Sequence, residues 1–240
     1  MIEDALEALR KGEIILLYDF DDREGETDFA ICSEFIKPEH ILKMRRDGGG
    51  LICTAIHHKA AERIGLPFAS DVLKITDFAE KEGAIPYDRT NHSSFSLWVN
   101  HRDTFTGITD IDRSVTAGRI AEHVKAAIEG DLLDFSAEFR TPGHMAILRA
   151  NESLLDKRRG QTELSIALAG MAGVTPAVTI CEMLDDKTGK ALSKKDAIEY
   201  AKEHDLVFIE GNDVLKIWKE EKILSKSRPN VASDALKACQ

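Results

Sequence analysis

The sequence predicts a single domain in which helices and strands alternate along the chain. Its 240 residues are enough for one large domain or two small ones, and 43% of them are hydrophobic, which suits a globular protein with a sizeable core. Apolar residues recur at helical spacing in some segments and form short unbroken runs in others. No Ser-, Gly- or Pro-rich linker and no internal repeat divides this pattern, so we predict one domain rather than two.

The N-terminal part predicts two helices and three buried strands. Ile2, Ala5, Leu6 and Leu9 fall on one helical face, and Gly12 follows where a C-terminal cap belongs. A second helix is expected to begin at a first-turn proline and to stop at a run of glycines. The expected segments are a helix ending before residue 12, strands over 14–18, 29–32 and 51–56, and the second helix over 38–47.

The C-terminal part continues the alternation. Phe95, Leu97 and Val99 alternate with other residues as in a half-buried strand, and Ser193 with Asp196 forms a cap-like start to a later helix. The expected segments are strands over 95–99, 145–148, 177–183 and 206–209, and helices over 115–128, 162–171, from 193 and over 212–222.

Two segments follow no clear pattern. Residues 64–89 contain Pro67, Gly83 and Pro86, and we assign them only loosely. After about residue 221 the sequence becomes polar and loses its periodicity. We therefore predict a domain over residues 1–221 and a mobile C-terminal tail over 222–240 that is too short for a second enzyme domain.

The charge balance and the apolar runs argue against several functions. The chain carries 32 basic and 42 acidic residues, a net charge of −10, which disfavours nucleic acid and anionic membranes as partners. The longest apolar runs fall far short of the ~20 residues of a membrane span, and the acidic start of the chain is untypical of a signal peptide. Cys32, Cys53, Cys181 and Cys239 lack C-x-x-C spacing, so we expect reduced thiols in a cytoplasmic protein.

The most informative segment is the acidic run over residues 19–28. Six acids and one arginine lie within these ten residues, between two apolar strand-like runs. Carboxylates at this density suit a hard cation such as Mg²⁺, and a carboxylate can also act as a general base. Gly25 would allow a sharp turn between Glu24 and Glu26. A site for a metal and a base and a solvated acidic hairpin are both consistent with this pattern.

Three further features have two interpretations each. Arg158, Gly160 and Thr162 precede a predicted helix, where they could bind an anion or simply cap the helix. His144 could be an acid or base, or a structural residue. Glu182 lies inside an apolar run and needs either a partner or a functional role, unless it reaches solvent at the strand end. The sequence has no P-loop, dinucleotide-binding or serine-hydrolase motif.

Taken together, the polar runs resemble the 3,4-dihydroxy-2-butanone 4-phosphate synthases, lyases of riboflavin biosynthesis, in an archaeal-like form with a single activity. The resemblance spans roughly residues 1–220, and its motifs occur in the family's order. They are DREGETD (22–28), GGLICT (49–54), FTGIT with DR (105–109 and 112–113), FRTPGH (139–144), RRGQTE (158–163) and ICE (180–182).

The resemblance implies a fold, a reaction and an assembly. The fold would be a compact α+β domain with a mixed sheet surrounded by helices. The reaction would convert D-ribulose 5-phosphate into formate and L-3,4-dihydroxy-2-butanone 4-phosphate with Mg²⁺ or Mn²⁺ and no organic cofactor. The chain would form a homodimer with its site at the subunit interface and would bind neither nucleic acid nor membrane.

The resemblance also assigns roles to residues that match the family's motifs. The catalytic group would comprise Asp19, Glu26, Cys53, His144 and Glu182. The substrate-binding group would comprise Arg23, Glu24, Asp28, Thr109, Arg158, Gly160, Gln161, Thr162 and Glu182. The metal ligands would be Glu24 and Gln161.

Gln161 is where this chain departs from the family pattern. The family has a metal-binding histidine at this position, in the motif Arg-x-Gly-His-Thr-Glu. A glutamine offers an amide oxygen, which Mg²⁺ accepts as a ligand, but the geometry around the metal would change. We therefore expect an active synthase, with a non-catalytic or attenuated sugar-phosphate-binding homologue, or a metal-binding structural protein, as the alternatives.

Overall fold

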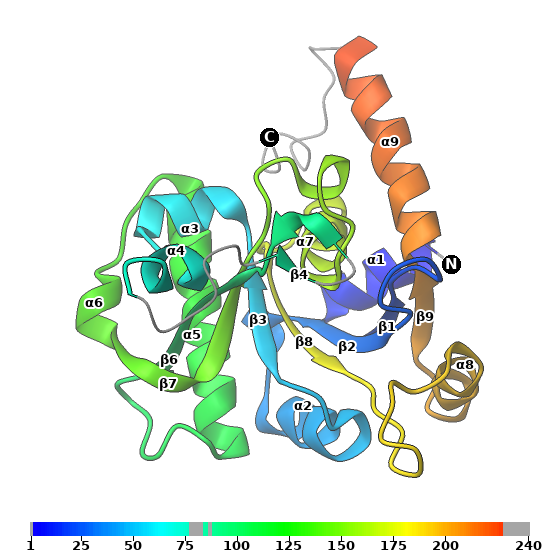
Figure 1. Ribbon diagram of the computed structural model, residues 1–240, viewed down its shortest axis with the longest axis horizontal. Helices are drawn as coiled ribbons and strands as arrows, with labels where there is room; N and C mark the ends of the chain where they lie inside the picture. Colours follow the sequence, from blue (N-terminus) through cyan, green and yellow to red (C-terminus); the bar gives the residue numbers. More distant parts are fainter. Residues whose placement is uncertain (1, 77–83, 86–87, 228–240) are drawn as a thin grey trace.

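Seven strands form one mixed sheet through the middle of the molecule in the computed structural model (Figure 1). The structure describes residues 2–76, 84–85 and 88–227. The strands of the sheet are β1 (Ile15–Tyr18), β2 (Thr27–Cys32), β3 (Cys53–Ile56), β6 (Phe95–His101), β7 (Phe139–Arg149), β8 (Ala177–Glu182) and β9 (Val207–Glu210). A separate two-stranded ribbon is formed by β4 (Ala84–Ile85) and β5 (Asp88–His92).

The strand order of the sheet is β6-β7-β3-β8-β2-β1-β9. The pairs β1–β9 and β3–β7 are parallel, and the other neighbours are antiparallel. This mixed sheet within an α+β fold confirms the fold class that the sequence motifs implied.

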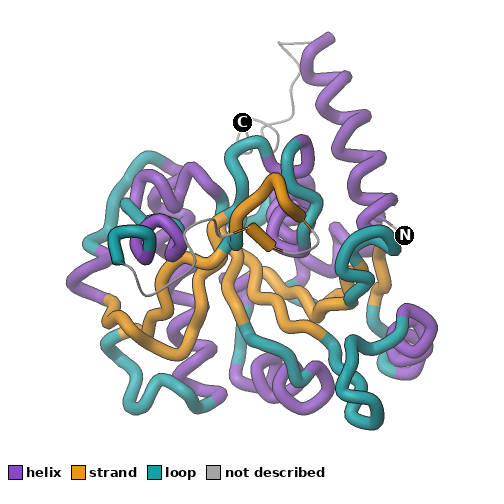
Figure 2. Tube along the Cα trace, viewed as in Figure 1, coloured by secondary structure: helices purple, strands orange, loops and turns teal. Residues whose placement is uncertain are grey.

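Helices cover both faces of the sheet (Figure 2). They are α1 (Ile2–Lys11), α2 (Pro38–Lys43), α3 (His58–Ile64), α4 (Ala69–Leu73), α5 (Asp110–Glu129), α6 (Phe135–Glu138), α7 (Gln161–Ala172), α8 (Lys194–Glu203) and α9 (Gly211–Ser227). Helices α1, α7 and α9 share a core with one face of the sheet, and α2, α5 and α8 pack on the other face. Because no described helix combines the length and apolar character of a membrane span, no spanning segment is found in the described residues.

The alternation of side chains along the strands separates these two cores. In β2, Ala30 and Cys32 face the core that contains α7, whereas Phe29 and Ile31 face the opposite core. The same alternation holds in β1, β3, β7 and β8. Each fully buried Leu, Ile or Phe side chain contributes roughly 1.5–3 kcal/mol to folding. The alternation therefore fixes which polar residues at the strand ends point toward α7.

Helix α7 is the central helix of its layer, and all twelve of its residues are buried. A helix that is buried all round normally carries apolar residues on every side. Its first turn instead buries Gln161, Thr162 and Glu163. Polar groups buried at a helix N-terminus require partners or a ligand, which directs attention to this end of α7.

Most of the expected elements are present, with differences at their ends. The strand expected over 145–148 is the last part of β7, which begins at Phe139 and pairs with β6 through Asn100↔Arg140 and His101↔Phe139. Its first half is polar and exposed, so the sequence shows no hydrophobic pattern there. The helix expected over 38–47 ends at Lys43 and continues as a π-helix over Met44–Gly48.

Some elements were not expected from the sequence. Helices α3 and α6 are short, and the loosely assigned segment over 64–89 contains α4 and parts of the β4–β5 ribbon. Helix α9 continues to Ser227, past residue 221, where we expected the domain to end. The tail that we predicted as mobile over 222–240 is therefore helical over 222–227. Residues 228–240 lie outside the described residues, and a single domain with a tail remains our proposal.

Candidate active site

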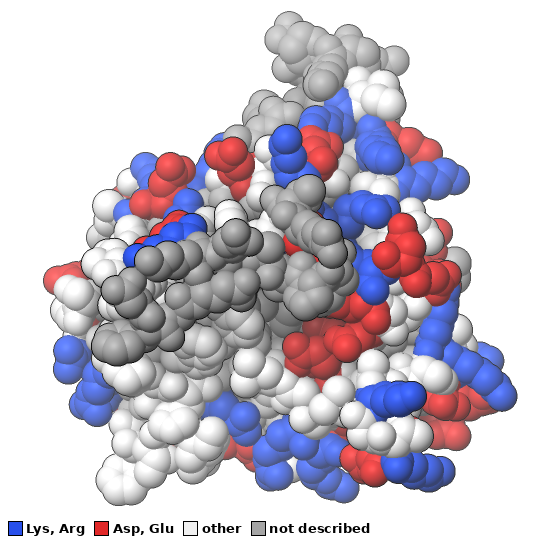
Figure 3. Space-filling model, viewed as in Figure 1, with Lys and Arg blue, Asp and Glu red and all other residues white. Residues whose placement is uncertain are grey.

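A cavity of about 170 Å³ lies beside the N-terminus of α7, where β2 and β3 begin and β8 ends. Its walls combine carboxylates, an arginine, an amide and apolar side chains. They are Glu24, Asp28, Cys53, Ser93, Ser94, Phe95, Leu148, Arg158, Gln161, Thr162, Ile180 and Glu182. On the face viewed in Figure 3, acidic side chains gather into one patch near the middle of the molecule.

Asp28 and Glu182 form a cross-strand pair of carboxyl groups in this cavity. They are directly opposite in the β2–β8 register, and each is two residues from a side chain of the α7 core, Ala30 or Ile180. Both side chains therefore leave the sheet on the α7 side, where like charges in opposite positions repel. Burial, reinforced by the charge of Glu182, raises the pKa of Asp28 well above its ordinary value. Burial also raises the pKa of Glu182.

The carboxylate of Asp19 holds the acidic loop in shape. It is fully buried and accepts hydrogen bonds from the backbone N–H groups of Glu24 (3.1 Å) and Glu26 (3.0 Å). The Nη1 of Arg23 lies 3.2 Å from the same carboxylate. Burial raises the pKa of Asp19, while the hydrogen bonds from the loop backbone oppose this shift. Asp19 is thus occupied by the loop itself and supports the groups that face the cavity.

The six acids of the loop divide into two sets. Asp21 accepts a hydrogen bond from the hydroxyl of Tyr18 (2.7 Å), and Asp22 pairs with Arg159 at 3.6 Å. The side chains of these two aspartates are 75% and 72% exposed. They match the interpretation of a solvated hairpin, whereas the other four acids are buried or half-buried near the cavity.

Glu24 lines the cavity, and Glu26 adjoins it through the contact between its backbone carbonyl and Gln161. Burial, and then the charges of Glu24, Glu182 and Asp19, raise the pKa of Glu26 to about 7. Glu24 lines the cavity and pairs with Nη1 of Arg23 at 3.0 Å. A carboxyl group with a pKa near 7 can accept and return a proton at neutral pH, which is what a general base requires.

A buried ion pair fixes Arg158 beside the N-terminus of α7. Its Nη1 donates to Oε2 of Glu163 at 2.5 Å, and the other carboxylate oxygen of Glu163 accepts the backbone N–H of Asn151 at 3.0 Å. A Cβ at Gly160 would collide with the guanidinium groups of both Arg158 and Arg23. A glycine at the N-cap of α7 therefore allows two guanidinium groups to approach the first N–H groups of the helix, which have no carbonyl partner within the helix. This arrangement suits an anion such as a phosphate.

The amide of Gln161 connects three parts of the site. Its Nε2 donates to the carbonyl oxygen of Leu17 at the end of β1 (3.0 Å) and to that of Glu26 in the loop (3.1 Å). Because carbonyl oxygens only accept, these two bonds identify Nε2 and leave Oε1 on the other side of the amide. Oε1 is buried and has no hydrogen-bond partner among the described residues.

Two oxygen ligands in the cavity suit a hard divalent cation. Gln161 Oε1 and the carboxylate of Glu24 belong to residues that line the same cavity, and oxygen is the ligand that Mg²⁺ prefers. Among the described residues, no group of three His, Cys, Asp or Glu side chains is placed to hold a metal ion. Mg²⁺ commonly takes only one or two carboxylates and completes its coordination with water and substrate. The described residues are therefore compatible with such a cation.

Cys53 belongs to the apolar wall of the cavity. Burial, and then the charges of Glu182 and Asp28, raise the pKa of its thiol well above the ordinary value. A thiol held in the protonated form is a poor nucleophile. Phe95, Leu148 and Ile180 complete this wall.

Six predicted site residues are not among those that line the cavity, and two of them, Thr109 and His144, belong to neither the acidic loop nor the start of α7. Thr109 caps α5, where its Oγ1 accepts the backbone N–H of Asp112 (3.1 Å). His144 is an exposed residue of β7, four positions before Leu148 and hence on the same face of the sheet. It contacts Asn100 of β6. Thr109 and His144 thus belong to a second, exposed group of residues around the β6–α5 loop.

The cavity brings together seven of the predicted site residues, from four segments far apart in the sequence: Glu24, Asp28, Cys53, Arg158, Gln161, Thr162 and Glu182. Arg23, Glu26 and Gly160 adjoin them through the contacts above. Sequence analysis missed Ser93, Ser94, Phe95, Leu148 and Ile180 as lining residues, and Glu163 as the partner of Arg158. For Glu163 there was a signal, since an acid at the start of an apolar helix needs a partner.

Comparison with known proteins gives consistent matches over most of the chain. The family model described as 3,4-dihydroxy-2-butanone 4-phosphate synthase matches residues 3–217. A protein of that name from Archaeoglobus fulgidus is 54% identical over 225 residues, which cover 91% of this chain and 94% of that protein. These matches confirm the resemblance that the motifs indicated.

Solved structures of the same kind have a similar fold. The enzyme of that name from Candida albicans has a TM-score of 0.71 and 28% identity, covering 90% of this chain and 96% of that one. Another synthase structure, described as a complex with two magnesium ions, has a TM-score of 0.71 and 23% identity and covers 96% of this chain and 98% of that one.

The clustered carboxyl groups predict a pH-dependent stability in protein freed of metal by a chelator. The pKa of Glu26 is raised from 4.5 to about 7, so the folded chain holds a proton that the unfolded chain has released. Stability should therefore decrease as the pH rises through this interval. We expect Glu26→Gln to make the decrease shallower and to stabilise the protein at pH 8 by on the order of 1–2 kcal/mol, allowing for solvent screening.

Urea denaturation at a series of pH values measures this effect. The matched control is Glu203→Gln, the same change at an exposed position of α8, which should leave the profile unaltered. Identical pH profiles for wild type and Glu26→Gln would contradict the placement of Glu26 among the other carboxylates.

Proposed function

The chain belongs to the 3,4-dihydroxy-2-butanone 4-phosphate synthase family, and on that premise we propose how its cavity acts on the substrate. The chain is a lyase of riboflavin biosynthesis that converts D-ribulose 5-phosphate into formate and L-3,4-dihydroxy-2-butanone 4-phosphate with Mg²⁺. The two products together contain all the atoms of the substrate. Neither an oxidant nor a second substrate is therefore needed, in agreement with our proposal that no organic cofactor takes part.

The proposal rests chiefly on one observation. A single cavity combines carboxyl groups of raised pKa with an arginine and the N-terminus of α7. The reaction must remove a proton next to a carbonyl, release a hydroxyl group, shift a carbon and expel formate. Several of these steps move a proton. Because the products contain every atom of the substrate, the hydroxyl that leaves as water must be balanced by a water that adds back before formate is expelled. The phosphate must be held still meanwhile. The cavity has residues suited to both tasks.

Glu24 and Gln161 are the proposed ligands of the divalent cation, Mg²⁺ or Mn²⁺. The buried Oε1 of Gln161 and the carboxylate of Glu24 support this assignment. A solved synthase described as a complex with two magnesium ions supports a divalent cation here, without identifying its ligands. When bound, the cation would supply positive charge beside the substrate carbonyl and so favour loss of the neighbouring proton.

Glu26, Asp28 and Glu182 are the proposed proton carriers. With a pKa of about 7, Glu26 is ionised in part of the molecules at neutral pH and can take the proton next to the carbonyl. The raised pKa of Asp28 favours the protonated form of its carboxyl group, which can donate a proton to the departing hydroxyl group. Glu182, on the neighbouring strand, can return a proton to the product. Asp19 and Cys53 would support the loop and the wall.

Arg158, Gly160 and Thr162 are the proposed phosphate site. The ion pair with Glu163 fixes the guanidinium of Arg158, and Thr162 lines the cavity in the first turn of α7. Arg23 lies close to Gly160 and can add a second positive charge. Binding at this end would fix the orientation of the reacting carbons.

We propose that the chain acts as a homodimer in which Thr109 and His144 belong to an interface close to the site. The surface around Thr109 supports this because it exposes large apolar side chains. Phe105 is 95% exposed, Ile108 49% and Ile111 64%. Large apolar side chains that are exposed next to one another often mark a surface that binds a partner. A second copy covering them would bring its own Thr109 and His144 next to a neighbouring chain.

Our remaining proposals concern the ligand, other partners and the location of the chain. We propose a small sugar phosphate as the ligand, no nucleic acid or membrane partner, and a cytoplasmic location. The buried free thiols of Cys32, Cys53 and Cys181 fit a reducing compartment.

Release of formate from ribulose 5-phosphate tests the proposed function. We expect the purified chain to form one formate per substrate in the presence of Mg²⁺ and to stop when a chelator is added. Glu182→Gln should lower kcat by on the order of 10²–10⁴-fold because it removes a proton carrier. Glu203→Gln on the exposed face of α8 is the matched control and should retain full activity. Folded protein that releases no Mg²⁺-dependent formate would overturn the proposal.

Substitutions of Gln161 separate an active synthase from a homologue that has lost catalysis. Gln161→Leu removes the oxygen ligand and both hydrogen bonds, and we expect it to weaken Mg²⁺-dependent activity about 10–100-fold. Gln161→His should change activity by less than about tenfold, since either ligand can serve. A large gain from near-zero activity on Gln161→His would support the non-catalytic alternative instead.

A mixture of two inactive variants tests whether the site is shared between subunits. His144→Ala and Glu182→Gln are denatured together and refolded so that mixed dimers form. If each site takes His144 from one chain and Glu182 from the other, half of the sites in a mixed dimer are intact. The mixture should then regain about a quarter of wild-type activity. Mixed dimers that form but stay inactive would show that both residues act within one chain.

A further inference from the structure

We propose that Asn100 is a positioning residue for His144, holding the imidazole in the tautomer that carries its proton on Nε2. Asn100 is a half-buried residue of β6, and His144 lies beside it on β7. The catalytic part of this inference rests on the proposed function, because the inference gives His144 a role in that reaction. Its structural part rests on the contacts between the two side chains alone.

The orientation of the Asn100 amide follows from the backbone of His144. The N–H of His144 donates to Oδ1 of Asn100 at 2.8 Å. A backbone N–H can only donate, so the accepting atom must be the carbonyl oxygen of the amide. The Nδ2 of Asn100 is therefore the atom that faces the imidazole, 3.1 Å from Nδ1 of His144.

The amide orientation in turn fixes the imidazole. Because an amide NH₂ group can only donate, Nδ1 of His144 accepts a hydrogen bond and carries no proton in the neutral ring. The proton then lies on Nε2. Oδ1 of Asn100 also lies 3.3 Å from Nδ1, farther than Nδ2 at 3.1 Å, so the contact with Nδ2 is the shorter of the two. A neutral ring of this tautomer presents a donor on Nε2, away from Asn100.

The turn at Thr106 and Gly107, just before α5, packs against the Asn100 side chain. Nδ2 of Asn100 lies 3.5 Å from the carbonyl oxygen of Thr106, and a Cβ at Gly107 would collide with the Asn100 amide. Gly107 is buried and has a φ of +87°, a backbone conformation that favours glycine. The close approach of this turn thus leaves the Asn100 side chain little room to rotate.

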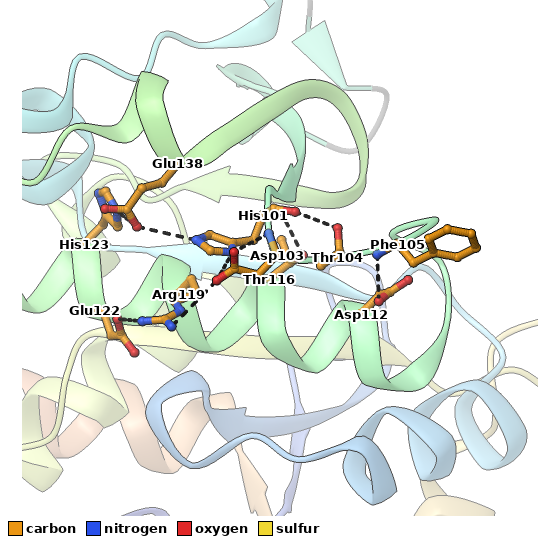
Figure 4. A network of polar contacts seen from close by, with 10 residues as sticks. All are labelled: His101, Asp103, Thr104, Phe105, Asp112, Thr116, Arg119, Glu122, His123 and Glu138. Atoms are coloured by element: carbon orange, nitrogen blue, oxygen red, sulfur yellow. Dashed lines mark hydrogen bonds and ion pairs between the residues drawn. The ribbon is translucent and has the colours of Figure 1, made fainter.

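The carboxylate of Asp112 holds that turn in place. It accepts hydrogen bonds from the backbone N–H groups of Phe105 (3.3 Å), Thr106 (3.1 Å) and Gly107 (2.8 Å). Figure 4 shows Asp112 at the start of α5 with its carboxylate beside the backbone of Phe105. The same region continues through Thr104, which donates to the carbonyl oxygen of His101. The support for His144 therefore extends through Asn100 into α5.

The arrangement has a chemical consequence for His144. With Nδ1 engaged and its proton on Nε2, the imidazole can donate a hydrogen bond or a proton to an oxygen placed beyond Nε2. The opposite tautomer would present a bare lone pair there. Asn100 would thus decide whether His144 acts first as a donor or as an acceptor.

Nitrogen NMR of the histidine ring, in full-length protein labelled with ¹⁵N-histidine, tests this inference. His144 is assigned by the signals lost in His144→Gln. In the neutral ring at alkaline pH, we expect a pyridine-type signal for Nδ1 and a pyrrole-type signal for Nε2. A wild-type ring with its proton on Nδ1 would overturn the inference, and this measurement requires no variant of Asn100.

Asn100→Asp tests the role of the amide, because it replaces the NH₂ group with an oxygen and keeps the shape of the side chain. A carboxylate of the same shape accepts from both the backbone N–H and the ring, so Nδ1 of His144 should become pyrrole-type while the fold is retained. We expect kcat to fall about 10–100-fold with KM within threefold, because orientation rather than binding is altered. Asn212→Asp, the same change at an exposed site on α9, should alter neither the spectrum nor kcat.

The two readouts separate this inference from the proposed function. Unchanged ring signals or unchanged kcat in folded Asn100→Asp would overturn the role of Asn100. If the wild-type chain releases no formate, the proposed function fails, whereas the ring spectrum still decides whether Asn100 sets the tautomer.

Discussion

The site depends on the hydrogen bonds of one amide, that of Gln161. Through Nε2 it connects the first turn of α7 to the end of β1 at Leu17 and to the acidic loop at Glu26. These bonds fix the position of the loop relative to the strands that carry Asp28 and Glu182. They leave Oε1 of Gln161 buried and without a hydrogen-bond partner among the described residues, in a side chain that lines the cavity. One side chain therefore joins three parts of the site, and the same side chain is our proposed metal ligand.

The cluster of acids is costly for the folded chain and useful for its chemistry. Asp28 and Glu182 face each other on adjacent strands, and protonation of one of them reduces their repulsion. Buried like charges of this kind are common at functional sites, where stability is given up for reactivity. Arg23 and Arg158 supply the nearest positive charges, but both are engaged with other carboxylates. A cation and a phosphorylated substrate would each relieve part of the remaining imbalance.

The sequence predicted the components of the site better than their arrangement. The acidic loop, the start of α7 and the acid at the end of β8 each broke a local rule and so could be noticed. That Asp28 pairs with Glu182 could not be deduced, because it depends on the register between strands some 150 residues apart in the chain. Asn100 gave no signal, and Asp112 was noticed only as part of a family motif, since ordinary polar residues near a loop acquire their roles only through contacts. Strands were identified where one face was buried, but the polar half of β7 was not.

The most direct test of this account is a crystal structure with ribulose 5-phosphate and Mn²⁺, in which anomalous scattering identifies the cation. We expect the cation between Glu24 and Gln161, with Gln161 Oε1 inside its coordination sphere, while Nε2 keeps its bonds to Leu17 and Glu26. A cation bound by carboxylates alone, with Gln161 Oε1 outside its coordination sphere, would contradict the role assigned to Gln161.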